Sequence, residues 1–299
     1  MTMKLPSTKP FQLIAAPFTA FHVDSSLNPG MIERQCEALI KSGVSGAFVC
    51  GTTGEGSSLT VEERMAVVER WSEVRPAGFR LFIHVGHTSV RDAQALAKHA
   101  EKCKVDAIAA VAPFFFKPAV PELVEFCRQV TTGVSLPFFY YHIPAMSGVN
   151  IKVIEFLRAA EKVLPTLAGI KFTHEDLMDF ATCMDFAGGR YEMLFGRDEI
   201  LLPGMTFGAR GAVGSTYNYD APIYRRLIAA YDAGDLPTAR AEQAAAQRAI
   251  DVLIRFGGLP AGKTILKLRG VDCGPVRSPL RNLTSDQIAA LEKALSSLS

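Results

Sequence analysis

The chain has 299 residues, of which 48% are hydrophobic and 21% are charged, and its formal net charge is +2. This composition supports a large buried core and excludes a disordered or fibrous protein. The 32 basic and 30 acidic residues nearly cancel, so no dense basic field is available to a phosphate backbone, and we expect no nucleic-acid partner. The chain shows neither a run of roughly 18 apolar residues nor the apolar stretch of a signal peptide near its start. We therefore expect no membrane association and a cytoplasmic location.

The six cysteines lack the paired spacing of a zinc site or of a redox dithiol. We expect most of them to be small buried apolar residues in a reducing compartment. They are Cys36, Cys50, Cys103, Cys127, Cys183 and Cys273.

Short runs rich in β-branched or aromatic residues alternate with amphipathic stretches, as in a parallel sheet with helical crossovers. The eight predicted strands are Leu13–Phe18, Gly46–Cys50, Arg80–Val85, Ala107–Ala112, Pro137–Ile143, Leu167–Thr173, Glu192–Phe195 and Gly211–Thr216. Thr60 and Glu63 have the spacing of a capping box, which predicts that a helix starts there. Because no linker divides the first 220 residues, the fold class is α/β, and one closed (β/α)8 TIM barrel is simpler than two doubly wound domains.

The segment after the eighth predicted strand is helical, and Pro222 marks the first turn. The helices predicted there are Ala221–Asp232, Leu236–Phe256, Ala261–Arg269 and Ser285–Ser297. A barrel requires only one final helix. Residues 1–220 are therefore predicted to form the barrel core, and residues 221–299 the last barrel helix and a C-terminal helical extension packed on the barrel as one structural unit.

Two candidate catalytic residues lie at the carboxyl ends of the fifth and sixth predicted strands, where chemistry belongs in a barrel. Strand alternation points Lys171 into the barrel together with Gly169, which leaves space beside the amine. The same alternation points Tyr141 inward and His142 outward. A buried amine has a depressed pKa and can attack a ketone, and a phenol can move the protons that imine chemistry requires. The pair predicts a Schiff-base enzyme.

The loop Gly51-Thr52-Thr53-Gly54-Glu55-Gly56 follows the second predicted strand. Two hydroxyls and exposed backbone N–H groups at a strand-to-helix junction suit a small anion such as a carboxylate. A plain turn is the alternative, since glycine permits positive φ and threonine is common in loops.

Two other motifs have structural interpretations. His174, Glu175 and Asp176 are neighbours at a predicted helix start, where acidic side chains complement the helix dipole, so we expect no metal site. Gly257–Thr264 satisfies the phosphate-loop expression, but it follows a predicted helix rather than a strand. We therefore expect no nucleotide site.

These segments together resemble the family of pyruvate-dependent Schiff-base lyases that contains dihydrodipicolinate synthase and N-acetylneuraminate lyase. The resemblance covers essentially the whole barrel and is greatest to the N-acetylneuraminate lyase branch. It is carried by Ala112–Pro118, Tyr140–Ala145 and Phe195–Glu199. Met146 stands where dihydrodipicolinate synthase carries an arginine for a second carboxylate, which argues against a dicarboxylate-forming synthase.

The resemblance implies that Lys171 forms the imine, that Tyr141 relays protons and that Thr52 and Thr53 bind the carboxylate. It also implies a set of residues that bind the sugar chain. These are Thr173, Gly196, Asp198, Glu199, Gly214 and Ser215. Carboxylates accept hydrogen bonds from several hydroxyls, so the acidic pair among them favours a polyhydroxylated substrate; a negatively charged helix start is its alternative.

The implied reaction is the reversible cleavage of N-acetylneuraminate to pyruvate and N-acetylmannosamine, with no metal and no organic cofactor. The implied partners are the keto sugar acid, pyruvate and further copies of the chain in a homotetramer. Phe114–Phe116 would suit a subunit contact, at a segment where many family members place a tyrosine from a neighbouring subunit. The alternatives are another pyruvate-dependent aldolase or dehydratase of 2-keto sugar acids and a non-catalytic sugar-acid-binding barrel.

Overall fold

The computed structural model describes residues 10–298, so the expectation of no signal peptide falls partly outside the described residues. Eight parallel strands close into a barrel in sequence order. They are β1 (Gln12–Ala15), β2 (Gly46–Val49), β3 (Arg80–His84), β4 (Ala107–Val111), β5 (Phe138–His142), β6 (Leu167–Phe172), β7 (Glu192–Phe195) and β8 (Gly211–Gly214). The predicted TIM barrel followed by extra helices is confirmed.

Most strands end earlier than predicted, and the difference is largest at β1 and β8. The prediction continued β1 to Phe18 and β8 to Thr216, but a 3-10 helix, η4 (Thr216–Asn218), begins soon after β8. The Asn218 side-chain amide donates to the carbonyl of Ala16 at 2.7 Å. Residues 16–18 after β1 and Thr216 after β8 are buried although both strands have ended, so apolar composition overestimates strand length.

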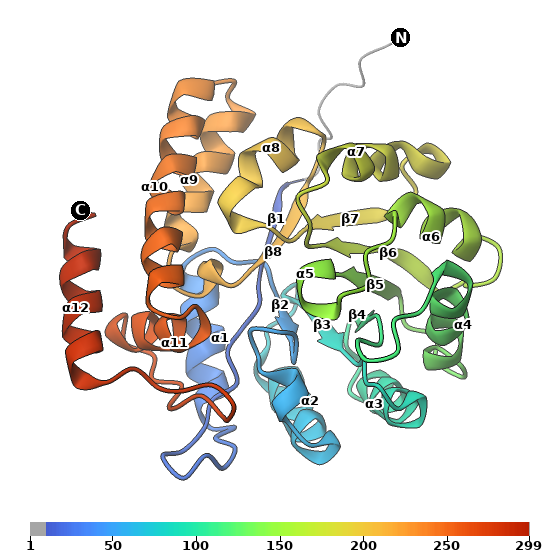
Figure 1. Ribbon diagram of the computed structural model, residues 1–299, viewed down its shortest axis with the longest axis horizontal. Coiled ribbons are helices and arrows are strands. Elements are labelled where there is room, and N and C mark those ends of the chain that lie inside the picture. The colour runs from blue at the N-terminus through green and yellow to red at the C-terminus, as the bar shows by residue number, and fades with distance from the viewer. Residues whose placement is uncertain (1–9, 299) are drawn as a thin grey trace. The chain divides into compact units, whose positions relative to one another are not determined.

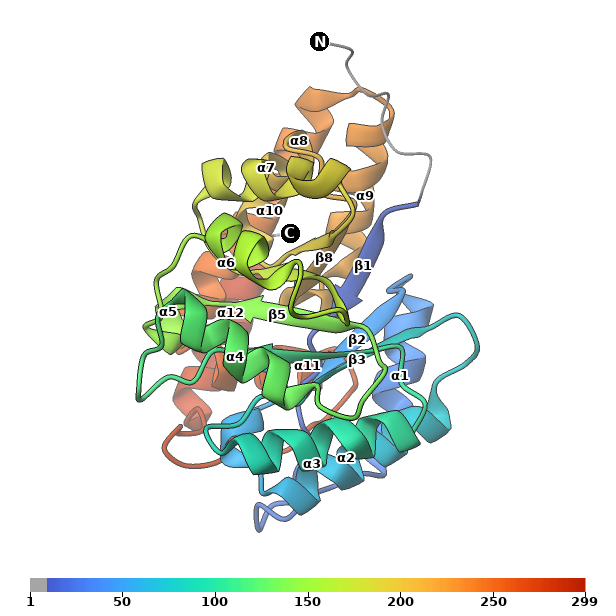
Figure 2. The same cartoon turned by 90° about the vertical axis from the view of Figure 1, so that its right-hand side faces the viewer.

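The chain divides into two compact units. Among the described residues, the first unit consists of residues 10–13 and 82–213. Its helices are α3 (Val90–Lys102), α4 (Val120–Val130), α5 (Pro144–Ser147), α6 (Val153–Ala160), α7 (Leu177–Asp185) and α8 (Leu201–Thr206). Helices α3, α4, α6 and α7 pack against one another in that order, as Figures 1 and 2 show.

The second unit consists of residues 14–81 and 214–298. Its helices are α1 (Met31–Lys41), α2 (Val61–Val74), α9 (Ala221–Asp232), α10 (Leu236–Arg255), α11 (Leu259–Leu268) and α12 (Ser285–Ser296). The capping box of Thr60 and Glu63 at the start of α2 is confirmed. In Figure 1 α9 and α10 lie side by side, and α10 also packs against α11 and α12.

The phosphate-loop look-alike lies between two helices. Helix α10 ends at Arg255, and α11 begins at Leu259, two residues before its predicted start, with Pro260 in its first turn. A phosphate loop follows a strand, whereas this segment follows a helix, as the sequence predicted.

Strand β5 presents different side chains to its two faces. On one face the rings of Phe139 and Phe82 meet edge to face, with centroids 5.2 Å apart. On the other, Tyr140 packs on Phe156 of α6 with centroids 4.5 Å apart. Tyr140 is therefore on the helix-covered face, and its neighbour Tyr141 is on the inner face, as predicted.

The six cysteines are reduced thiols, and five of them are buried, which confirms their structural interpretation. No helix within residues 10–298 is both long enough and apolar enough to cross a membrane.

Candidate active site

Lys171 is buried near the carboxyl end of β6, in register with Tyr141 on β5. Only 4% of the residue is exposed, and its Nζ lies 4.0 Å from the centroid of the Tyr141 ring. Burial lowers the pKa of Lys171 to about 7, and the negative charge of Asp198 acts in the opposite direction. The predicted inward direction of the amine and its depressed pKa are both confirmed.

His84 is a neighbour of Tyr141 that sequence reasoning missed. The two rings meet edge to face with centroids 5.9 Å apart, and His84 Nε2 accepts a hydrogen bond from the Val111 backbone N–H at 3.2 Å. Strand alternation carries the signal that could have found it, because His84 follows the inward Phe82 by two residues on β3.

The position beside Gly169 is occupied, so the free space predicted there is not present. A Cβ atom on Gly169 would lie 2.5 Å from a ring carbon of Phe139 and 2.1 Å from the Glu192 carbonyl oxygen. Glycine at this position therefore allows the Phe139 ring and the neighbouring strand to approach closely.

His142 packs among aromatic rings on the helix-covered face of β5. Its ring centroid lies 5.4 Å from that of Phe172 and 5.5 Å from that of His174. Burial is the main cause that lowers the pKa of His142 to about 3, with a smaller contribution from His174. His142 is thus a neutral core side chain at neutral pH, as its outward direction predicted.

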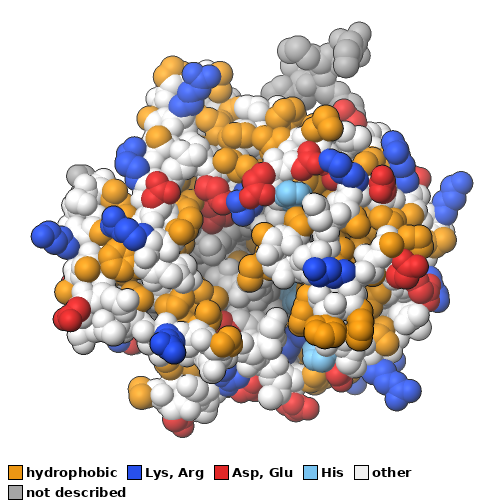
Figure 3. Space-filling view, in the orientation of Figure 1, with side chains coloured by type: hydrophobic (Ala, Val, Ile, Leu, Met, Phe, Trp, Pro, Cys, Tyr) orange, Lys and Arg blue, Asp and Glu red, His pale blue; other side chains and the backbone are white. Residues whose placement is uncertain are grey.

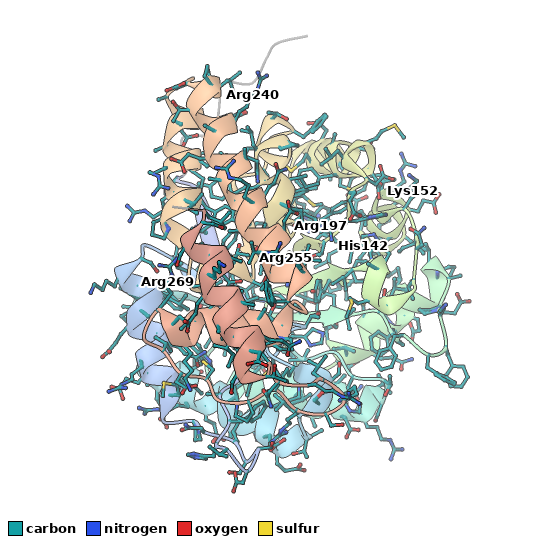
Figure 4. The ribbon with its side chains drawn as sticks, turned by 60° about the vertical axis from the view of Figure 1, so that its left-hand side comes forward. His142, Lys152, Arg197, Arg240, Arg255 and Arg269 are labelled. Carbon is teal, nitrogen blue, oxygen red and sulfur yellow. The ribbon has the colours of Figure 1, made fainter. Side chains whose placement is uncertain are left out.

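The loop after β7 carries two acidic side chains with different surroundings. Asp198 is buried, whereas Glu199 is partly exposed and pairs with Arg197 at 3.0 Å. Arg197, labelled in Figure 4, also pairs with Glu175. A 3-10 helix, η3 (Asp198–Ile200), begins at the acidic pair, so these residues do mark a short helix start. Arg197 was not predicted from the sequence as a residue of the site.

Thr173 and Gly196 lie directly beside each other. The Gly196 backbone N–H donates to the Phe172 carbonyl at 2.8 Å, and a Cβ atom on Gly196 would lie 2.0 Å from Thr173 Oγ1. The Thr173 hydroxyl oxygen is buried and has no hydrogen-bond partner within the described part of the chain. Glycine at position 196 therefore leaves the space that the Thr173 side chain occupies.

His174, Glu175 and Asp176 precede α7, as the helix-start interpretation predicted. Asp176 is the N-cap, and its carboxylate accepts the Asp179 backbone N–H at 3.0 Å while pairing with Lys152, labelled in Figure 4. Within residues 10–298 no cluster of three or more histidine, cysteine or acidic side chains could hold a metal ion.

In the second unit, the loop Gly51–Gly56 after β2 is a tight turn. The Gly56 backbone N–H donates to the Gly51 carbonyl at 3.1 Å, and the Thr19 hydroxyl donates to the Gly54 carbonyl at 2.6 Å. Gly56 is required, because a Cβ atom there would lie 2.0 Å from the carbonyl oxygen of Cys50.

Thr52 and Thr53 are the least buried residues of this tight turn. Gly214 and Ser215, also in the second unit, follow each other at the end of β8. The Asn218 side-chain amide donates to the Ser215 carbonyl at 2.7 Å.

The structure thus brings Lys171, Tyr141 and Asp198 together in the first unit and places Thr173, Gly196 and Glu199 in that same unit. The remaining predicted site residues, Thr52, Thr53, Gly214 and Ser215, lie in the second unit.

The chain is similar to known proteins over almost its whole length. A model of the dihydrodipicolinate synthetase family matches residues 9–298. The N-acetylneuraminate lyase of Mus musculus is 41% identical over 303 residues, which cover 99% of this chain and 95% of the mouse protein.

Solved structures show the same similarity. The Proteus mirabilis N-acetylneuraminate lyase has 42% sequence identity and a TM-score of 0.94, covering 98% of this chain and 99% of that one. A catalytic lysine mutant of the Ruminococcus gnavus sialic acid aldolase has 27% identity and a TM-score of 0.91, covering 96% of this chain and 95% of that one. The chain belongs to the dihydrodipicolinate synthetase family.

Proposed function

We propose that this chain is a carbon–carbon lyase that cleaves N-acetylneuraminate reversibly to pyruvate and N-acetylmannosamine. The names of its relatives in mouse and Proteus mirabilis support this reaction. The observation that carries it is the buried Lys171 amine, whose pKa burial lowers to about 7 and whose Nζ lies 4.0 Å from the Tyr141 ring centroid. An amine that loses its proton near neutral pH is a nucleophile for a ketone.

In the proposed mechanism the neutral Lys171 amine attacks the keto carbon of the substrate, and loss of water gives an iminium ion. The Tyr141 hydroxyl relays the proton of the substrate hydroxyl as the carbon–carbon bond breaks: its oxygen accepts that proton while its own proton passes to the substrate carboxylate. The bonding electrons move into the iminium, which becomes an enamine. Protonation of the enamine and hydrolysis of the imine release pyruvate and regenerate the amine.

The remaining residues are proposed to bind substrate. Thr52 and Thr53 hold the carboxylate through their hydroxyls and the turn's backbone N–H groups. The carboxylates of Asp198 and Glu199 accept hydrogen bonds from sugar hydroxyls. The other contacts to the sugar chain come from Thr173, Gly196, Gly214 and Ser215.

The lowered pKa of Lys171 predicts a pH profile. Since only the neutral amine attacks, the rate of imine formation with saturating pyruvate should rise through about pH 7 and level off above it. Asp198 raises the pKa of Lys171, so Asp198→Asn should move the midpoint to lower pH. Single-turnover trapping with cyanoborohydride across a pH series measures both midpoints. A midpoint near that of an exposed lysine would contradict the burial argument.

A substrate panel tests the reaction itself. Pyruvate release should be fastest from N-acetylneuraminate among a set of 2-keto acids that differ in chain length and acyl group. Faster release from a shorter 2-keto sugar acid would instead identify another aldolase or dehydratase. Tight binding without turnover of any member would identify a sugar-acid-binding barrel.

We also propose a homotetramer located in the cytoplasm. Phe115 and Phe116 are large and mostly exposed, and Figure 3 shows a gathering of hydrophobic side chains over this segment between β4 and α4. Exposed apolar patches of this kind suit a subunit contact. The reduced, mostly buried cysteines suit a reducing compartment. Light scattering of the purified protein measures its mass, and a monomer would contradict the tetramer.

A further inference from the structure

A buried ion pair in the second unit lies next to the threonine turn. Lys263 of α11 places its Nζ 2.8 Å from Glu55 Oε1, and 3% and 2% of the two side chains are exposed. Lys263 also donates to the Pro275 carbonyl at 2.7 Å. Burying two charges is costly unless their geometry and remaining hydrogen bonds are good, so this pair is not an ordinary core contact. The proposed chemistry uses neither residue.

The second oxygen of the Glu55 carboxylate is also engaged. Glu55 Oε2 accepts the Arg277 backbone N–H at 2.8 Å. The Arg277 guanidinium makes two hydrogen bonds to the Glu63 carboxylate, at 2.6 and 2.5 Å, and donates to the Ser25 and Ser58 carbonyls. The segment after α11 is therefore tied both to Glu55 and to the start of α2.

One aromatic ring contacts both cations. The Phe21 ring centroid lies 4.4 Å from Lys263 Nζ and 4.2 Å from Arg277 Cζ. Cation–π contacts strengthen when they are shielded from water, so the ring favours fixed positions for both cations.

Glu55 connects this network to the threonine turn. Its backbone N–H donates to the Thr52 carbonyl at 3.1 Å, and its φ of 52° is in the left-handed region that side-chain-bearing residues rarely adopt. Such a conformation persists only when its surroundings hold it. The contacts to its carboxylate fix the position of Glu55. The hydrogen bond from the Glu55 backbone N–H to the Thr52 carbonyl then restricts the position of Thr52 as well.

We propose that Lys263 and Arg277 are positioning residues, which hold Glu55 and thereby fix the turn of Thr52 and Thr53 in the geometry that binds the keto-acid carboxylate. This inference rests on the proposed function, because it takes the two threonines as the carboxylate site. It assigns a role in pyruvate binding to the C-terminal helical extension.

The test measures trapping of pyruvate by borohydride as a function of pyruvate concentration in the full-length protein. Lys263→Met should raise the half-saturating pyruvate concentration roughly tenfold to a hundredfold, the scale that a small misplacement of a binding group produces. The maximal trapping rate should stay close to that of the unaltered protein, because the reacting amine is untouched. Lys267→Met is the matched control, since Lys267 lies on the same helix in an exposed pair with Asp272; it should leave both quantities unchanged.

A double variant separates positioning from stability. Lys263→Met leaves the Glu55 carboxylate buried without its cation, whereas Glu55→Gln with Lys263→Met removes both charges and should recover much of the lost thermal stability. The double variant should keep the raised half-saturating pyruvate concentration. If the single variant does not fold, the double variant is the one whose pyruvate affinity is measured. Recovery of pyruvate affinity together with stability would overturn the proposal, as would unchanged half-saturation in the folded variants. Absence of trapping in the unaltered protein would instead reject the proposed function, and this inference with it.

Discussion

Replacing Lys171 with methionine is expected to lower the rate of pyruvate release from N-acetylneuraminate by on the order of 10⁴-fold or more, the scale seen when a covalent nucleophile is removed. The reason is that, in the proposed mechanism, the iminium that accepts the electrons of the breaking bond forms on the Lys171 amine. Methionine has a similar length and no charge, so the buried site keeps its packing and loses the cost of burying an amine. A coupled assay for pyruvate measures the change.

The matched control is Lys152→Met in the same unit. Lys152 precedes α6 and pairs with Asp176 at the surface, and the proposed mechanism assigns it no role. Activity close to that of the unaltered protein is expected for this variant. Turnover that survives in the Lys171 variant would show that the nucleophile has been assigned to the wrong residue.

Replacing Tyr141 with phenylalanine should lower the maximal rate by roughly 10²- to 10⁴-fold, the contribution typical of a positioned proton-transfer group. Phenylalanine keeps the ring that lies beside Lys171 and His84, so the surroundings of the amine change little. Rapid-quench measurements of pyruvate release, with imine trapping in parallel, would locate the loss.

The Tyr141 variant should still form the imine with pyruvate, because carbon–carbon cleavage is the step that most needs the phenol in the proposed mechanism. Tyr140→Phe is the control on the adjacent residue, which packs on α6 instead of the inner face. A full rate for Tyr141→Phe would assign proton transfer to another group.

Strand alternation allowed much of the first unit's site to be predicted. The positions of Lys171 and Tyr141 on the inner face follow from the two-residue period of a strand. The same rule applied to β3 would have revealed His84. That the position beside Gly169 is occupied could not be predicted, because the Phe139 ring found there belongs to another strand.

Where the strands end was harder to predict because burial continues after the ladder stops. The Ala16 carbonyl is bonded by the Asn218 side chain, and nothing in the local composition of β1 signals that contact. Residues that stay buried in loops thus look like strand residues in a sequence pattern.

The network around Glu55 could not be anticipated from local patterns. Arg277 and Glu55 are 222 positions apart, and the segment that carries Lys263 imitates a phosphate loop. An ion pair between distant segments depends on tertiary packing, which motif spacing does not encode. The structure was needed to show that this lysine is buried against a carboxylate.

The central claim is that the Lys171 amine bonds covalently to the keto carbon of the substrate. Incubation with pyruvate and borohydride, followed by peptide mass mapping, tests it most directly. The account predicts one stable pyruvate-derived adduct per chain on the peptide that contains Lys171. An unmodified Lys171, or an adduct on a different lysine, would contradict it.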